Sequence, residues 1–483
     1  MPTRYPRLAS LKNSTAFKDH IDKLGISESI PFETDTSTPN IEALSRPLTL
    51  FDGSRIGNRF CIQPMEGWDA SPNGIPTELV RRRWKKFGES GAKLIWGGEA
   101  TAINHAGRAN PNQLRLEKDT VAEINKLLSL LIDSHEKKFK NSEDLLVGLQ
   151  LTHSGRFCRP ERSDKIEPVS LYSHHILDKK FKLNSISAIA SDNQIESIID
   201  KFVEAGTLAY EIGFDFVDIK HCHGYLGHEF LSSFERPGPF GGSFKNRTRF
   251  LRSIVTRLQK KNYDCKIGVR LSAFDFLPFE PSPDNGYGIL VKSNDPYQQP
   301  FGLATNSSTE IDLTEPIKLL SMLKDMGVFL INITAGSPYY CPHIQRPALF
   351  PPSDGYKPPE DPLIGVARQI GVVHKLKKLF PEIIFVGSGY SYLQEWLPFV
   401  AGEAISKGFT DFIGLGRISL SYPTIANDIL SGKTLERKLI CRTFSDCTTA
   451  PRHGIISGCY PLDPFYKNLS EFNELEKIKS KRI

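Results

Sequence analysis

Apolar positions in this chain fall into two kinds of segment that alternate along most of its length. One kind is a short, nearly continuous apolar run, which is typical of a strand buried on both faces. The other has apolar residues spaced at about 3.6 positions with charged residues on the opposite side, which predicts amphipathic helices. The predicted strands are residues 59–64, 93–97, 145–151, 214–219, 266–271, 329–334, 383–387 and 411–415, and the predicted helices are 78–90, 120–135, 193–212, 246–260, 315–326, 362–379, 392–407 and 423–431.

This regular order predicts a parallel sheet whose strands are connected by helices. An open doubly wound sheet would use the same units, but eight strand–helix repeats favour closure into a (β/α)₈ TIM barrel. We therefore predict an α/β fold with a single barrel domain at residues 48–440. An N-terminal arm at residues 1–47, with a short helix at 15–24, would precede the barrel, and a C-terminal extension at residues 441–483 would pack on it.

Two long segments interrupt the pattern after predicted strands. Residues 275–312 are rich in proline, glycine, asparagine and serine, and residues 338–361 contain seven prolines. Segments that follow barrel strands lie on the catalytic face, where long loops often select the substrate. We therefore expect both loops to cover that face.

Composition and charge exclude several classes of function. The chain has 483 residues and a net charge of +6, which is weak for this size and does not indicate nucleic-acid binding. It contains no apolar stretch long enough to cross a membrane and no signal-peptide core. Its eight scattered cysteines are typical of reduced thiols. We expect a cytoplasmic enzyme that acts on a small-molecule substrate, with neither nucleic acid nor a membrane as partner, and a homodimer is compatible with the sequence.

Glycines and an arginine gather at the ends of the last two predicted strands. Gly387 and Gly389 follow the seventh strand, and Gly416 and Arg417 follow the eighth. Small residues allow backbone N–H groups to approach an anion, and a guanidinium adds charge, so this pair predicts a phosphate site. The alternative is that the glycines only form tight turns. A Gly-x-Gly-x-x-Gly fingerprint is absent, so we expect no separate nicotinamide domain.

The strand-end residues and neighbouring motifs together resemble the Old Yellow Enzyme, or NADH:flavin oxidoreductase, family, within it the branch related to bacterial 2,4-dienoyl-CoA reductases. The resemblance extends over residues 48–463, and its matching stretches are 58–65, 87–100, 150–160, 223–231, 241–250 and 414–417. It implies a non-covalent FMN cofactor, reduction by NAD(P)H, and hydride transfer to an activated carbon–carbon double bond of an unsaturated carbonyl compound.

The resemblance also assigns cofactor-binding roles to individual residues. Pro64 and Met65 would lie against the flavin ring with Ala100 nearby, Gln150 would bond its pyrimidine edge, and Arg270 would stabilise the negative charge of the reduced ring. Gly387, Gly389, Gly416 and Arg417 would hold the phosphate.

Three further residues carry the chemistry that the resemblance implies. Tyr225 matches the proton donor and His223 matches a residue that hydrogen-bonds the substrate carbonyl. A second carbonyl-binding position is Lys220 here, where relatives often have histidine, which hints at an anionic or strongly polarised substrate group. From the residues alone, His223 could equally be a packed histidine and Tyr225 a core aromatic.

Other positions depart from the family pattern. Glu66 follows the Pro-Met pair where many relatives have a small residue or cysteine, and its role is open. Cys441, Cys447 and Cys459 match three of the four cysteines that hold an iron–sulfur cluster in the dienoyl-CoA reductase branch, but Phe444 replaces the remaining one. We therefore expect no cluster, no other metal site, and no additional FAD or nucleotide domain before the chain ends at Ile483.

Two other functions remain open from the sequence. Lys220 at a strand end could form a Schiff base in a lyase or aldolase barrel. The changes at Lys220 and Glu66 also allow an FMN-binding protein without ene-reductase activity.

Overall fold

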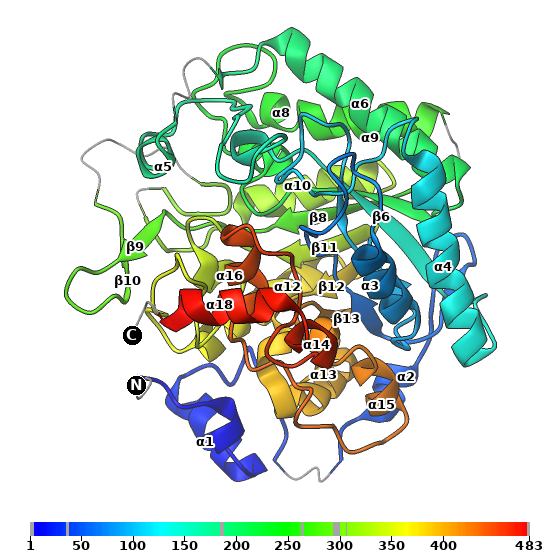
Figure 1. Ribbon diagram of the computed structural model, residues 1–483, viewed down its shortest axis with the longest axis vertical. Coiled ribbons are helices and arrows are strands. Elements are labelled where there is room, and N and C mark those ends of the chain that lie inside the picture. Colours follow the sequence, from blue (N-terminus) through cyan, green and yellow to red (C-terminus); the bar gives the residue numbers. More distant parts are fainter. Residues whose placement is uncertain are drawn as a thin grey trace.

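The centre of the molecule is a closed barrel of eight parallel strands (Figure 1). It is seen in a computed structural model that describes residues 4–34, 38–183, 188–261, 265–292, 300–305 and 307–480. The barrel closes because β13 pairs with β3 on one side and β4 pairs with β6 on the other. Its strands are β3 (Phe60–Ile62), β4 (Leu94–Ile95), β6 (Leu146–Thr152), β7 (Phe216–Ile219), β8 (Lys266–Ser272), β11 (Leu330–Thr334), β12 (Ile384–Gly387) and β13 (Phe412–Leu415).

Helices follow the strands and cover the outside of the barrel, so the predicted (β/α)₈ fold is confirmed. Each predicted helix has a counterpart near its predicted position, and the helix over residues 193–212 starts from a capping box at Ser191. The covering helices are α3 (Glu78–Gly88), α4 (Val121–Phe139), α6 (Asp192–Glu211), α9 (Arg249–Lys261), α10 (Thr314–Asp325), α12 (Pro362–Leu379), α13 (Leu397–Ser406) and α15 (Ile425–Leu430).

Three predicted elements are interrupted. The second strand stops at Ile95 and resumes as β5 (Ala100–Ala102) beside β6. Gly97 lies in this gap with φ 135°, and a Cβ there would come within 2.6 Å of the Gln150 backbone nitrogen, so the close approach requires glycine. The predicted helix over residues 392–407 is a 3₁₀ segment, η4 (Tyr390–Trp396), followed by α13, and the predicted helix over residues 246–260 starts as α8 (Phe244–Arg247) before α9.

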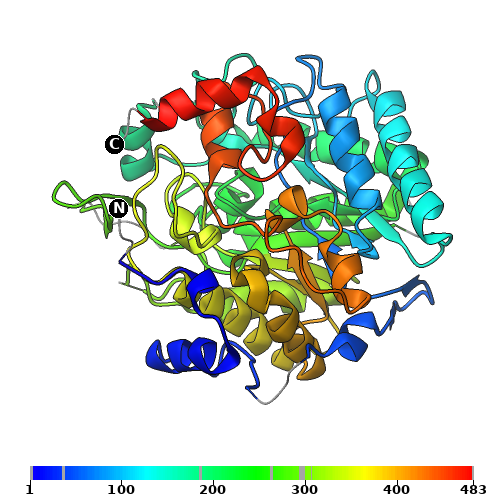
Figure 2. The ribbon, with the colours of Figure 1, turned by 60° about the horizontal axis from the view of Figure 1, so that its bottom comes forward.

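The N-terminal segment packs on the outside of the barrel. It contains η1 (Leu8–Ser10), α1 (Ser14–Lys23) and α2 (Ile41–Ser45), and a two-stranded sheet of β1 (Leu48–Thr49) and β2 (Arg55–Ile56) follows. Phe17 of α1 stacks on Trp396 with ring centroids 4.6 Å apart. Figure 2 shows α1 and α18 on opposite sides of the molecule. The division of the chain at residues 47 and 440 stays a prediction.

Loops and the C-terminal segment cover the ends of the strands. The segment after β8 forms an antiparallel pair, β9 (Phe279–Pro281) and β10 (Gly288–Leu290). Figure 1 shows α16 (Asp446–Arg452) and α18 (Ser470–Ser480) in front of the barrel. Shorter helices complete this side: η2 (Gly155–Phe157), α5 (His175–Phe181), α7 (Leu226–Leu231), α11 (Pro342–Gln345), α14 (Ile418–Ser421) and α17 (Pro464–Lys467).

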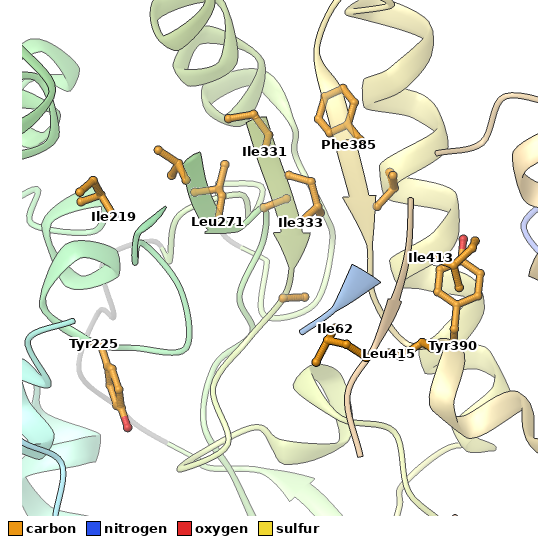
Figure 3. Packing of buried hydrophobic residues seen from close by; sticks show 14 of the residues in the cluster. Ile62, Ile219, Tyr225, Leu271, Ile331, Ile333, Phe385, Tyr390, Ile413 and Leu415 are labelled. Carbon is orange, nitrogen blue, oxygen red and sulfur yellow. The ribbon is translucent and has the colours of Figure 1, made fainter. Parts of the chain in front are cut away.

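Apolar side chains form two layers, one on each face of the barrel wall. The larger layer lies between strands and helices, and Figure 3 shows part of it, including Ile331, Phe385 and Ile413. The smaller layer fills the barrel interior around Trp96 and Phe216. Among the described residues, no helix is both long and apolar enough to span a bilayer.

Candidate active site

The carboxyl ends of the strands open into a cavity of about 1150 Å³. Both long loops border it, as predicted, through Phe279 and Tyr339 among others, and the C-terminal segment adds Cys447 and Arg452. Part of the first loop, residues 293–299 and 306, lies outside the described residues. Ten of the predicted site residues line the cavity: Pro64, Met65, Ala100, Gln150, Lys220, His223, Arg270, Gly389, Gly416 and Arg417. Tyr225 and Gly387 do not line it.

A buried carboxylate, Asp218, organises one wall of the cavity. Its Oδ2 accepts hydrogen bonds from Gln150 Nε2 at 2.6 Å and Trp96 Nε1 at 2.8 Å, and its Oδ1 accepts the backbone N–H of Arg270 at 2.6 Å. Burial raises the pKa of Asp218 to about 6. Sequence reasoning missed this residue, although parallel pairing places it opposite Gln150.

Arg270 presents an unpaired donor beside this wall. Its Nη1 donates to the Pro64 carbonyl at 3.0 Å, while its buried Nε has no partner among the described residues. Burial lowers the pKa of this guanidinium. Because a buried polar group without a partner is costly, the free Nε marks a position where a ligand acceptor fits.

A second set of unpaired donors lies at the ends of β12 and β13. Arg417 donates from Nη2 to the Pro347 carbonyl at 2.8 Å, and its buried Nη1 has no partner within the described ranges. Gly389 has φ 94°, and a Cβ on Gly416 would meet no atom within 4 Å. Arg346, which was not predicted, has an equally unpartnered Nε and Nη2, and burial next to Arg452 and Arg417 lowers its pKa to about 9.

These two donor sets fit the cofactor that the resemblance implies. FMN has a ring, which gains negative charge on reduction, and a phosphate group. The unpartnered nitrogen of Arg270 provides a cation for the ring, and that of Arg417 provides one for the phosphate. Gly387 contributes differently, because its carbonyl accepts a hydrogen bond from Gln63 Nε2 at 3.2 Å and a Cβ would crowd Tyr390.

Lys220 and His223 face the cavity from the turn after β7. The Lys220 ammonium lies 3.9 Å from the ring centroid of Tyr225, and burial lowers its pKa. His223 has φ 66°, a strained conformation for a side chain other than glycine. Its Nε2 lies 3.3 Å from both Thr334 Oγ1 and Gln345 Nε2, and burial holds its pKa well below the usual range, so the ring is neutral.

Tyr225 lies directly behind the cavity wall. Its side chain is buried, and its hydroxyl contacts Glu66 Oε2 and, at 2.9 Å, the hydroxyl of Tyr339. Figure 3 shows its oxygen pointing away from the strands. Glu66 and Tyr339, the two partners of the Tyr225 hydroxyl, both line the cavity. Tyr339 was not predicted, since a single tyrosine in a proline-rich loop carries no signal.

The C-terminal cysteines approach the same cavity. Cys447 and Cys459 line it, and burial raises the pKa of Cys441 and Cys459. Phe444 is 39% exposed and lies against Phe350. Among the described residues, no group of three or more histidine, cysteine, aspartate or glutamate side chains is placed to hold a metal ion. The absence of an iron–sulfur cluster stays a prediction.

Comparison with known proteins identifies a consistent group of relatives. A model of the NADH:flavin oxidoreductase / NADH oxidase family matches residues 43–280. The NADPH dehydrogenase of Bacillus subtilis is 27% identical over 300 residues, which cover 61% of this chain and 73% of that protein. The Bacillus velezensis NADPH dehydrogenase is 29% identical over 299 residues, with the same coverage of 61% and 73%.

Solved structures share the fold at low sequence identity. A 2-naphthoyl-CoA reductase complex matches with a TM-score of 0.63 at 17% identity, covering 90% of this chain and 58% of the other. Morphinone reductase in complex with tetrahydroNAD matches with a TM-score of 0.55 at 17% identity, covering 81% of this chain and 92% of the other. This chain therefore spans less than two thirds of the naphthoyl-CoA reductase chain and nearly all of the morphinone reductase chain.

Proposed function

We propose that this chain, a flavin-dependent oxidoreductase of the NADH:flavin oxidoreductase family, binds FMN non-covalently, accepts electrons from NAD(P)H and reduces an activated carbon–carbon double bond. The observation that carries this proposal is that two guanidinium groups in one cavity, Arg270 near Gln150 and Arg417 near two glycines, each have one buried nitrogen without a partner among the described residues. Pro64, Met65, Ala100, Gln150 and Arg270 would hold the flavin ring, and Gly389, Gly416 and Arg417 would hold the phosphate.

FMN, when bound, would supply the hydride chemistry between NAD(P)H and the β-carbon of an unsaturated carbonyl substrate. The chain's own residues would handle the oxygen and the proton. Negative charge develops on the substrate carbonyl oxygen, and the Lys220 ammonium, which has no hydrogen-bond partner within the described residues, can donate to it. Neutral His223 can supply a second donor, and the hydroxyl of Tyr225 holds the proton needed by the α-carbon.

An absorbance experiment tests this function. The purified protein is measured before and after anaerobic NADPH, and again after addition of 2-cyclohexenone. We expect flavin bands that bleach with NADPH and return with the enone. Bleaching without return would leave a flavoprotein without ene-reductase activity. A colourless protein that takes up no added FMN would overturn the proposal and favour Schiff-base chemistry at Lys220, which borohydride trapping with a carbonyl substrate would detect.

We also propose a cytoplasmic location and a small-molecule substrate. All eight cysteines lie within the described residues and are unbridged, which suits a reducing compartment. A homodimer is the proposed assembly, and light scattering of the purified protein would measure its mass.

A further inference from the structure

A row of hydrogen-bonded groups, two tyrosine hydroxyls and one glutamate carboxyl, connects the buried Tyr225 to the cavity. Tyr225 is 1% exposed, whereas its two partners, Glu66 and Tyr339, are both partly exposed and line the cavity. The Tyr225 hydroxyl contacts Glu66 Oε2 on one side and lies 2.9 Å from the Tyr339 hydroxyl on the other. Tyr339 itself is fixed by stacking on Phe157, with ring centroids 4.1 Å apart.

The charge state of Glu66 determines which group donates in each of the hydrogen bonds that connect Glu66, Tyr225 and Tyr339. An ionised carboxylate can only accept, so Tyr225 must donate its single proton to Glu66 and can only accept a proton from Tyr339. In this state neither tyrosine has a proton directed at the cavity. A protonated Glu66 donates to Tyr225 instead, Tyr225 donates to Tyr339, and the Tyr339 O–H is free to point into the cavity.

We propose that Tyr339 delivers the proton to the substrate, that Tyr225 relays it, and that Glu66 stores it. This inference rests on the proposed function and refines its protonation step. The Tyr339 O–H bond breaks as the new C–H bond forms at the α-carbon. The Tyr225 proton moves to the Tyr339 oxygen and the Glu66 proton moves to the Tyr225 oxygen. Glu66 is left as a carboxylate and takes a new proton from solvent through the cavity.

The surroundings favour such a concerted transfer over a free tyrosinate. Burial and the Glu66 charge raise the pKa of Tyr225 far above its usual range and that of Tyr339 to about 12. A tyrosinate behind the cavity wall is therefore costly unless it is reprotonated at once. The other titratable or charged groups that face these three residues are Lys220 and Cys222 beside Glu66, and Arg159 and Arg452 beside Tyr339.

Stopped-flow measurements on the FMN-loaded protein separate this role from direct donation by Tyr225. Tyr339→Phe and Tyr225→Phe are each reduced with NADPH and then mixed with 2-cyclohexenone. We expect both variants to be reoxidised about 100-fold more slowly or worse, the usual loss when a general acid is removed, with reduction by NADPH unaffected. Reoxidation of Tyr339→Phe within about twofold of the unmodified rate would overturn the proposal, because Tyr225 would then donate directly.

Tyr340→Phe is the matched control for loss of a buried hydroxyl. Tyr340 is the next residue in the same loop, but its hydroxyl contacts Asp275 rather than Glu66 or Tyr225. We expect its reoxidation rate to stay close to that of the unmodified protein. An equal loss in Tyr340→Phe and Tyr339→Phe would overturn the assignment, because the loop and not the hydroxyl would then be responsible.

The pH profile tests the storage role of Glu66. Only a protonated Glu66 can resupply the two tyrosines, so the reoxidation rate of the unmodified protein should fall as pH rises. Glu66→Gln keeps a hydrogen bond to Tyr225 but cannot ionise, so its rate should be lower and should lose this inflection. An unchanged inflection would assign the pH dependence to another group, such as Lys220, and overturn the role.

An infrared measurement tests, without turnover, whether Tyr225 is hydrogen-bonded to Glu66 as the proton relay requires. Subtraction of the Glu66→Gln spectrum isolates the protonated carboxyl band of Glu66 at low pH. Tyr225→Phe should shift that band, because it removes the hydrogen-bond partner. A band unaffected by Tyr225→Phe would overturn the relay. Failure of the enone to reoxidise the unmodified protein would instead count against the proposed function.

Discussion

The lower and upper halves of the barrel interior are built on the same strands but differ completely in chemistry. Alternate residues of a strand face the same side, so each inward position is followed by another inward position two residues later. The lower layer is apolar and contains Cys61, Leu94, Trp96, Leu146, Phe216, Leu330, Ile384 and Phe412. Two or four residues further along, the same strands or their ends carry Gln63, Gln150, Asp218, Asn332 and Ser388, which are all buried. Strand β8, whose Gly268 faces Trp96 and Phe216 in the lower layer, adds the buried Arg270 two residues later.

This difference separates stability from function within one continuous interior. Apolar side chains below gain free energy from burial, whereas the polar groups above are tolerated because they pair with one another. Asn332 Nδ2 donates to Gln63 Oε1 at 2.7 Å, and Gln63 Nε2 reaches Ser388 Oγ at 3.3 Å. The nitrogens left unpaired, such as Arg270 Nε, are those that a ligand would satisfy.

The largest effect is expected from a substitution that disrupts the packing of the lower layer. Phe216 is fully buried and packs edge-on against Trp96 with ring centroids 5.1 Å apart. Phe216→Ala should lower the free energy of unfolding of the cofactor-free protein by about 3–5 kcal/mol, as measured by urea denaturation. The affinity of the folded variant for FMN should change little. A large loss of FMN affinity without a loss of stability would contradict the division between layers.

Arg270→Met should have the converse effect in the upper layer. Removal of a fixed cation from a site where charge develops costs about 100- to 1000-fold in rate, so reduction of bound FMN by NADPH should slow by this factor. The cofactor-free protein should lose little stability, because a buried guanidinium whose pKa is already lowered is replaced by an apolar side chain. Arg270→Lys, which retains the charge, should recover part of the rate. If FMN in Arg270→Lys were reduced as slowly as in Arg270→Met, the result would argue against an electrostatic role.

Arg417→Gln sharpens the assignment of the phosphate end. A hydrogen bond to a charged group contributes about 1.5–3 kcal/mol, so fluorescence titration should show FMN binding weakened by about 10- to 100-fold. Riboflavin, which lacks the phosphate, is the control ligand and should bind both proteins equally. Equal weakening of both ligands would show that Arg417 acts on the fold of this region and not on the phosphate.

Strand and helix periodicity was sufficient to predict the barrel and its long loops, because both depend on local patterns. The interruptions were not predictable from the same pattern. Gly97, where the second strand is interrupted, lies close to the Gln150 backbone on a neighbouring strand, and the 3₁₀ segment η4 contains Gln394 with φ 54°. Gln394 accepts a hydrogen bond from Arg442 Nη1 at 2.6 Å, so both positions have neighbours that are distant in sequence.

The site shows the same limit. Ten residues expected from the resemblance line one cavity, because strand ends converge in a barrel. Asp218 lay hidden inside an apolar strand, and only its register against Gln150 and Arg270 gives it a role. Tyr339 and Arg346 come from a loop whose path no periodicity specifies, so their approach to Tyr225 and Arg417 could not be anticipated.

The smallest expected effect is a pH dependence that belongs to the upper layer alone. Burial raises the pKa of Asp218 from its ordinary value of 3.8 to about 6, so the folded state holds this proton more tightly than the unfolded chain does. Asp218 should therefore add about 1 kcal/mol of stability between roughly pH 7 and pH 5, and this contribution is lost as pH rises through 6.

Asp218→Asn should lower stability at every pH, because it replaces an acceptor among three donors, but it should also abolish this gain on acidification. Ile384→Val, in the lower layer, is the matched control and should lower stability equally at both pH values, since it removes no titratable group. Urea denaturation near pH 7 and near pH 5 measures the stability of the unmodified protein and of both variants, all without cofactor. If Asp218→Asn gained as much stability on acidification as the unmodified protein, the carboxyl would already be ionised in both states. The polar layer would then be held together by charge, and Asp218 would contribute to binding Arg270 as a full counter-ion.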